Sequence, residues 1–139
     1  MGGERNTIRV GAAALVVRRD GKVLIGKRSV WPKGMWVFPG GGLNFEERAE
    51  KAVVRELKEE TGLSIKPTEL ITVYEMLVPK HKVHRIIFFY RARVVGGKET
   101  PSDDIDELRW LTPKEITRLK FIGDSTIDIL KMAGLLGKK

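Results

Sequence analysis

The chain has no cysteine in its 139 residues. This absence excludes a disulfide framework, a thiolate zinc site and a catalytic cysteine. No apolar run reaches the length of a transmembrane helix, and no repeat or low-complexity segment divides the chain. Hydrophobic residues make up 42% and charged residues 32%, which is typical of a globular protein. We therefore predict one domain over residues 1–139.

One apolar run, residues 10–17, follows two arginines and resembles a short signal peptide. Arg18, Arg19 and Asp20 come directly after it, and a strand-like pattern resumes at Lys22. We interpret the run as a first β-strand. The sequence therefore predicts a cytoplasmic protein with no membrane partner.

The net charge of +8 suits a polyanionic partner. The basic residues are scattered, and the densest group, residues 80–85, is not accompanied by a known nucleic-acid-binding motif. This distribution favours a small anionic ligand over direct binding to RNA or DNA. The sequence leaves open whether the protein is a monomer or a homodimer.

The most specific pattern lies at residues 41–63, which read GGLNFEERAEKAVVRELKEETGL. Asn44 and Glu47 have the spacing of a helix N-cap and its reciprocal partner, and Gly62 stands where a left-handed helix end belongs. The spacing predicts a helix over residues 45–61. One face of it is apolar, and Arg55 falls on the opposite, solvent face.

Three acids of this helix, Glu56, Glu59 and Glu60, project toward the apolar side. They repel one another at helical spacing and lie near the negative end of the helix dipole. Such a cluster needs a compensating cation. Carboxylate oxygens are the ligands that Mg²⁺ and Mn²⁺ prefer, so we predict a divalent metal site here.

The same segment fits G-x5-E-x7-R-E-U-x-E-E-x-G-U, where U is aliphatic, at every specified position. The chain thereby resembles the Nudix hydrolases, the MutT-like superfamily. The resemblance implies an α/β/α sandwich of the α/β class, with a mixed sheet and a loop–helix–loop catalytic segment. The matching positions are Gly41, Glu47, Arg55, Glu56, Leu57, Glu59, Glu60, Gly62 and Leu63.

The resemblance also implies roles for individual residues. Glu56, Glu59 and Glu60 would bind Mg²⁺, or Mn²⁺ as the alternative, with the backbone carbonyl of Gly40 as a further ligand. Arg55 would orient the carboxylates and pair with Glu47. The general base would be either Glu56 or an acid within residues 103–107, and the number of ions stays open.

The rest of the chain has the pattern of strands with few helices. Residues 8–17 and 22–27 flank Asp20-Gly21, which predicts a hairpin. Further strands are expected at residues 36–38, 70–78, 84–95 and 108–111. A short helix should begin after Thr112, with proline in its first position, and a last helix near residue 124.

The substrate-binding residues are less well specified. Lys27 and Arg28 end the second strand and are candidates for phosphate or base contacts, while Gly40 and Gly41 border the predicted metal site. Trp31 lies in the loop before the glycines, where an aromatic ring can stack on a base. Trp36 and Phe38 are interpreted as core.

The predicted reaction is metal-dependent hydrolysis of a nucleoside diphosphate linked to another group. The first choice is a nucleoside triphosphate diphosphatase that releases a nucleoside monophosphate and diphosphate. A nucleotide-sugar or ADP-ribose hydrolase is the alternative. A catalytically idle domain that binds a nucleotide is the second alternative.

Overall fold

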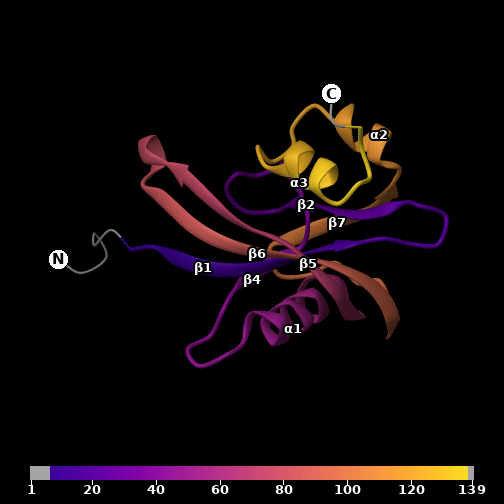
Figure 1. Ribbon diagram of the computed structural model, residues 1–139, viewed down its shortest axis with the longest axis horizontal. Coiled ribbons are helices and arrows are strands. Elements are labelled where there is room, and N and C mark those ends of the chain that lie inside the picture. The colour runs from indigo at the N-terminus through magenta and orange to yellow at the C-terminus, as the bar shows by residue number, and fades with distance from the viewer. Residues whose placement is uncertain (1–6, 138–139) are drawn as a thin grey trace.

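The strands form two sheets between two layers of helix (Figure 1). The computed structural model describes residues 7–137. The larger sheet has four strands in the order β4-β1-β6-β5, with β1 and β6 parallel and the other pairs antiparallel. The smaller sheet is antiparallel in the order β3-β2-β7. The strands are β1 (Arg9–Val16), β2 (Val23–Arg28), β3 (Trp36–Val37), β4 (Gly40–Gly42), β5 (Leu63–Val78), β6 (Val83–Gly97) and β7 (Ile105–Leu111).

Helix α1 (Ala49–Thr61) covers one face of the strands, and α2 (Pro113–Thr117) and α3 (Thr126–Met132) cover the other (Figure 1). A short 3-10 helix, η2 (Pro79–His81), lies at the tip of the β5–β6 hairpin. Two hydrophobic clusters fill the two spaces between these layers. The predicted α/β/α sandwich with a mixed sheet is thereby confirmed. Within residues 7–137 no helix is long and apolar enough to cross a membrane.

Strand β1 shows how the sequence builds both layers. Its side chains alternate, so Ala12, Ala14 and Val16 pack toward α1 while Ala13 and Leu15 pack toward α2 and α3. All five are buried. This burial on both faces explains why residues 10–17 form a continuous apolar run.

The turn of the predicted hairpin is present, but the prediction that the first two strands pair with each other along their length is wrong. At the turn, Asp20-Gly21, the amide of Arg18 bonds the carbonyl of Lys22 at 2.8 Å. A single bridge joins Val17 to Val23, after which β1 pairs with β4 and β6 while β2 pairs with β3 and β7. The strands separate because each finds its main partners in a different sheet.

The start of the helix predicted over residues 45–61 is also wrong, by about one turn. Helix α1 begins at Ala49 and is preceded by Arg48 in an extended conformation. Glu46 is left-handed, with a φ of 68°, which ends any helical path through residues 45–48. The side chain of Glu47 does accept the amide hydrogen of Asn44 at 2.9 Å, but this contact closes a loop before the helix.

The C-terminal end of α1 is as predicted. Gly62 has a φ of 77° and donates its amide hydrogen to the carbonyl of Lys58. Strand β5 then begins at Leu63, so the helix and the longest strand are joined without a loop. The strands expected at residues 70–78 and 84–95 are thus longer than predicted.

Replacing Gly62 by alanine is expected to lower the free energy of unfolding by about 3 kcal/mol, at the upper end of what one strained backbone residue costs. Alanine at this φ is strained, and its Cβ would overlap the backbone carbonyl of Lys98. Gly134→Ala is the matched control, because Gly134 has a φ of 78° and a Cβ added there would meet no atom within 4 Å. The control should lose only about 1 kcal/mol. Urea unfolding measures both, and equal losses would contradict the packing argument.

Candidate active site

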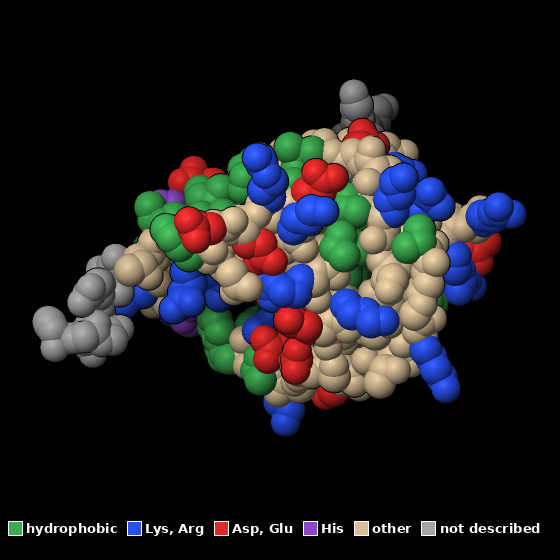
Figure 2. Space-filling model, turned by 90° about the horizontal axis from the view of Figure 1, so that it is seen from below, with side chains coloured by type: hydrophobic (Ala, Val, Ile, Leu, Met, Phe, Trp, Pro, Cys, Tyr) green, Lys and Arg blue, Asp and Glu red, His purple; other side chains and the backbone are tan. Residues whose placement is uncertain are grey.

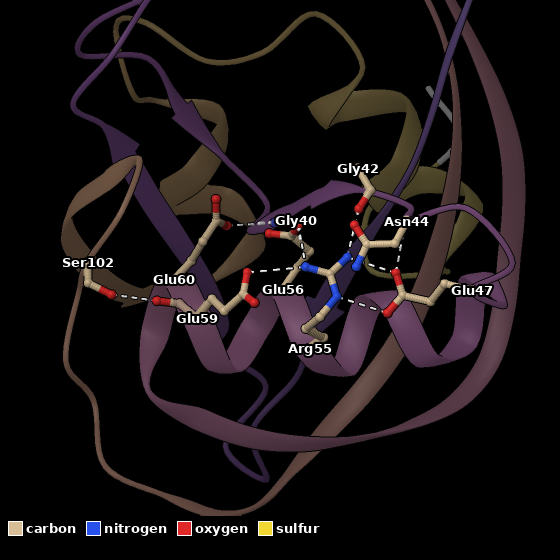
Figure 3. A network of polar contacts seen from close by, with 9 residues as sticks. All are labelled: Gly40, Gly42, Asn44, Glu47, Arg55, Glu56, Glu59, Glu60 and Ser102. Carbon is tan, nitrogen blue, oxygen red and sulfur yellow. Dashed lines mark hydrogen bonds and ion pairs between the residues drawn. The ribbon is translucent and has the colours of Figure 1, made fainter.

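The acidic end of α1 lies against the glycine strand β4 (Figure 3). Glu60 is almost completely buried, with 5% of its surface exposed. Its Oε1 accepts the amide hydrogen of Gly40 at 3.0 Å. Glu56 is partly buried, whereas the Glu59 side chain is 45% exposed. The prediction that all three acids point toward the apolar side is therefore right for Glu60, partly right for Glu56 and wrong for Glu59.

Arg55 ties the loop, β4 and α1 together (Figure 3). Two of its nitrogens, Nε and Nη2, donate to the two carboxylate oxygens of Glu47 at 2.8 Å each. Nη2 also donates to the carbonyl of Gly42 at 2.9 Å, and Nη1 donates to Glu56 at 3.0 Å and Glu59 at 3.2 Å.

The predicted solvent position of Arg55 is wrong, since only 28% of its side chain is exposed. The predicted pairing with Glu47 is present. Arg55 holds the pKa of Glu47 down at about 2, and the amide of Asn44 acts in the same direction. The two parallel bonds of Arg55 fix the position of Glu47, and its bond from Nη1 positions the Glu56 carboxylate.

Burial and neighbouring charges oppose the ionisation of Glu60. Desolvation raises its pKa to about 8, and the charges of Glu56 and Asp104 add to the effect, against the amide of Gly40. The pKa of Glu56 is also raised, by burial first, although Arg55 acts in the opposite direction. Both carboxylates therefore lie where a proton or a cation is favoured.

The glycines of β4 permit this close packing. A Cβ on Gly41 would overlap the Glu56 carboxylate, and one on Gly40 would overlap the backbone of Ala12 and Ala13 in β1. Gly40 therefore allows β4 to pair closely with β1, and Gly41 leaves the space that the Glu56 carboxylate occupies.

The carboxylates of Glu56, Glu59 and Glu60 are oxygen donors of the type that hard divalent cations prefer, and all three lie at the end of α1 next to β4. Within residues 7–137 no three acidic or histidine side chains converge tightly enough to enclose an ion, and Arg55 bonds Glu56 and Glu59 at once. The raised pKa values of Glu56 and Glu60 suit a cation that would keep them ionised. By donor type and electrostatics, the residues fit a divalent metal.

The face that carries α1 is hollowed next to acidic side chains (Figure 2). Red carboxylate side chains gather near the centre of this face, and a narrow hollow lies beside them. Hydrophobic and basic side chains border the hollow. Acidic side chains beside basic ones can accommodate a cation together with an anionic ligand.

The loop before β7 is fastened to the end of α1. The amide of Ser102 bonds the carbonyl of Glu60 at 3.0 Å, and its hydroxyl bonds the carbonyl of Glu59. The charge of Asp103 raises the pKa of Glu56, which places this loop acid near the site. Glu107 instead pairs with basic neighbours that lower its pKa. The sequence analysis missed Ser102, because a single serine carries no local signal.

Besides Gly40 and Gly41, three side chains are candidates for substrate binding, and they have different surroundings. Lys27 is tied to Glu107 at 3.1 Å within the smaller sheet. Arg28 is close enough to Glu60 to lower its pKa, and its Nη2 donates to the carbonyl of Trp31 at 2.8 Å. Trp31 is 60% exposed and meets the ring of His81 edge-on at 5.2 Å. The structure therefore brings Arg28 toward the acids and leaves the Trp31 ring accessible, whereas Lys27 is already paired.

Comparisons with known proteins identify sequence relatives of this chain. A protein-family model described as the NUDIX domain matches residues 7–129. A MutT-like protein of Streptomyces ambofaciens is 37% identical over 78% of this chain, and an ADP-ribose pyrophosphatase of Methanocaldococcus jannaschii is 36% identical over 76%. These matches span 66% and 63% of the two relatives, slightly less than two thirds of their lengths.

A solved structure of the same family superposes on this chain. The MutT NUDIX hydrolase of Burkholderia pseudomallei superposes with a TM-score of 0.81 at 28% identity. The superposition covers 91% of this chain and 98% of that one. The similarity therefore extends over nearly the whole chain and is not confined to residues 41–63.

Proposed function

Because this chain belongs to the Nudix family, we propose that it hydrolyses the diphosphate bond of a nucleoside diphosphate linked to another group, with a divalent cation as cofactor. The observation that carries the proposal is the pair of Glu60, which is buried, and Glu56, which is partly buried; both have raised pKa values and lie next to the glycine strand β4. Mg²⁺ is the proposed ion, with Mn²⁺ as the alternative. The favoured reaction converts a nucleoside triphosphate into a nucleoside monophosphate and diphosphate.

Each residue of the site has a distinct task in this proposal. Glu56, Glu59, Glu60 and the Gly40 carbonyl would hold the cation. When bound, a divalent ion neutralises the diphosphate oxygens and acidifies a water molecule. Arg55 keeps Glu56 and Glu59 in place through its two bonds from Nη1.

The proton of the attacking water needs an acceptor. Glu56 is one candidate, because a carboxylate whose pKa is raised toward neutrality is a more effective general base. The other candidates are the acids of residues 103–107, of which Asp103 and Asp104 are the best supported, since each is close enough to raise the pKa of a carboxylate on α1. Glu107 is the weakest candidate in residues 103–107, because Lys27 and Arg109 already bond its carboxylate.

A second candidate function is hydrolysis of ADP-ribose or of a nucleotide sugar. It is supported by the relative named as an ADP-ribose pyrophosphatase. An idle nucleotide-binding domain is less well supported, because every specified position of the catalytic segment is present. The deciding experiment measures product release with Mg²⁺, Mn²⁺ or neither from deoxynucleoside triphosphates, ADP-ribose, GDP-mannose and diadenosine polyphosphates. Release from none of them with either ion would contradict catalysis.

Trp31→Ala is expected to raise the Michaelis constant for the best nucleotide substrate by about tenfold, with the maximal rate little changed. Stacking of a base on an aromatic ring is worth about 1–3 kcal/mol, and the Trp31 ring is accessible. Steady-state kinetics measures the effect, and Trp31→Phe, which keeps an aromatic face, is the control. A Michaelis constant that the alanine leaves unchanged on all substrates would make Trp31 a packing residue.

A further inference from the structure

Two arginines stand side by side on the parallel strands β1 and β6. Arg9 is the register partner of Arg85, and the pairing runs without a shift from there to Val16. Side chains alternate along both strands, so Arg9 lies on the same face as Ala13, and Arg85 on the same face as Phe89. Ala13 and Phe89 belong to the cluster under α2 and α3. Both arginines therefore point to that side of the sheet.

A third arginine approaches from the smaller sheet. Arg28 ends β2, and the segment after it reaches the tip of the β5–β6 hairpin through the contact of Trp31 with His81. Burial lowers the pKa of Arg85, and the charges of Arg28 and Arg9 lower it further. Arg28 also acts on Glu60 of the active site. The three guanidinium groups thus form a basic cluster that extends from the acids toward the hairpin.

No carboxylate among residues 7–137 forms an ion pair with this basic cluster. None of the three guanidinium groups lies within ion-pair distance of a described carboxylate, whereas Arg18, Arg55 and Arg109 each have one. The Nε of Arg28 is buried and has no hydrogen-bond acceptor in the described part of the chain. Arg9 and Arg85 are exposed, so an anion can reach both guanidinium groups and offset the repulsion between their like charges.

We propose that Arg9, Arg28 and Arg85 form a subsite for a phosphate group other than the two whose linkage is cleaved. The inference rests on the proposed function, and it narrows the substrate class to nucleotides with three or more phosphates in a row. The acids of α1 and their cation would serve the cleaved diphosphate. The additional phosphate would accept charge-assisted bonds from the arginines, which suit phosphate geometry. ADP-ribose, which has two phosphates, leaves this subsite empty.

The test compares substrates in a double variant. Arg9→Met with Arg85→Met should lower kcat/KM for the best nucleoside triphosphate by about 100-fold, or about tenfold for each charge-assisted bond to phosphate that is removed. The value for ADP-ribose should fall by less than about fivefold, since only the general attraction of the positive surface is reduced. Diadenosine tetraphosphate has only internal phosphates, whereas a nucleoside triphosphate has a terminal one. Comparing the fall in kcat/KM for the two compounds therefore shows whether the subsite binds a terminal phosphate or an internal one.

Arg93→Met is the matched control. Arg93 is on the same strand β6 and pairs with Lys66, and eight residues of strand place it about 26 Å from Arg85. Arg93→Met removes one positive charge, as each substitution of the double variant does. It should leave kcat/KM for both substrates unchanged within about twofold, as expected of a surface position. Arg85→Lys, which keeps the charge without the fork of donors, should restore part of the loss. Urea unfolding confirms that each variant folds.

Three outcomes would overturn the subsite. The first is an equal fall in kcat/KM of the double variant for the nucleoside triphosphate and for ADP-ribose, and the second is no fall for either. The third is a wild-type protein that hydrolyses ADP-ribose well but nucleoside triphosphates poorly. The last result would leave the proposed hydrolysis of a diphosphate bond intact. If the wild type hydrolyses no substrate, the proposed function fails, and calorimetry with inorganic triphosphate then tests the subsite alone. Binding about tenfold or more tighter to the wild type than to the double variant supports it, and equal binding overturns it.

Discussion

Glu56→Gln is expected to lower the maximal rate by about 10²–10⁴-fold at saturating Mg²⁺, the contribution of a positioned acid or base. The Glu56 carboxylate accepts a hydrogen bond from Nη1 of Arg55 at 3.0 Å. It lies against Gly41, where a Cβ would overlap it. Glutamine keeps nearly the same shape, so the fold should be preserved. The loss would be measured as product release under single-turnover conditions, with Glu50→Gln on the exposed first turn of α1 as the control.

The response to metal separates two roles for Glu56. If excess Mg²⁺ restores the rate of Glu56→Gln, the carboxylate is a ligand only. The base would then be sought in the loop fastened to α1 by Ser102, with Asp103→Asn and Asp104→Asn as the next variants. A variant with the wild-type rate at every Mg²⁺ concentration would place the chemistry elsewhere.

Glu60→Gln is expected to abolish most hydrolysis and yet to stabilise the metal-free protein above pH 7. The pKa of Glu60 is about 8 in the folded protein, against 4.5 as its ordinary value. Between these values the folded state binds more protons than the unfolded state, so stability falls as pH rises through this window. A difference of this size corresponds to about 4–5 kcal/mol once the pH is above 8.

The amide of glutamine needs no proton and still offers an oxygen to the N–H of Gly40, which now bonds Oε1. The melting temperature of the wild type in EDTA should therefore fall from pH 5 to pH 9, and that of Glu60→Gln should fall less. Added Mg²⁺ should raise the melting temperature of the wild type more than that of the variant. Near wild-type turnover, or parallel pH profiles, would show that Glu60 is not the ligand we propose.

Local sequence determined the acidic segment at residues 41–63 and the residues at which helices begin and end. Gly62 ends α1 because a left-handed residue is needed there, and Thr112 begins α2 because its side chain and that of Glu115 cap the helix reciprocally. The burial of Trp36 and Phe38 followed from their hydrophobicity. These features depend on residues a few positions apart, so spacing alone reveals them.

The tertiary structure alone decided what lies around that segment. Helical periodicity placed Arg55 toward solvent, but the loop carrying Glu47 and the carbonyl of Gly42 folds over it and gives it partners. The separation of β1 and β2 into two sheets follows from pairings with β6 and β7, more than 70 residues further along the chain. Periodicity describes how one element presents its faces, whereas the partner of each face is set by packing between distant segments. The acids that we propose as metal ligands were therefore predicted from their spacing, and the basic cluster of Arg9, Arg28 and Arg85 exists only once the strands are assembled.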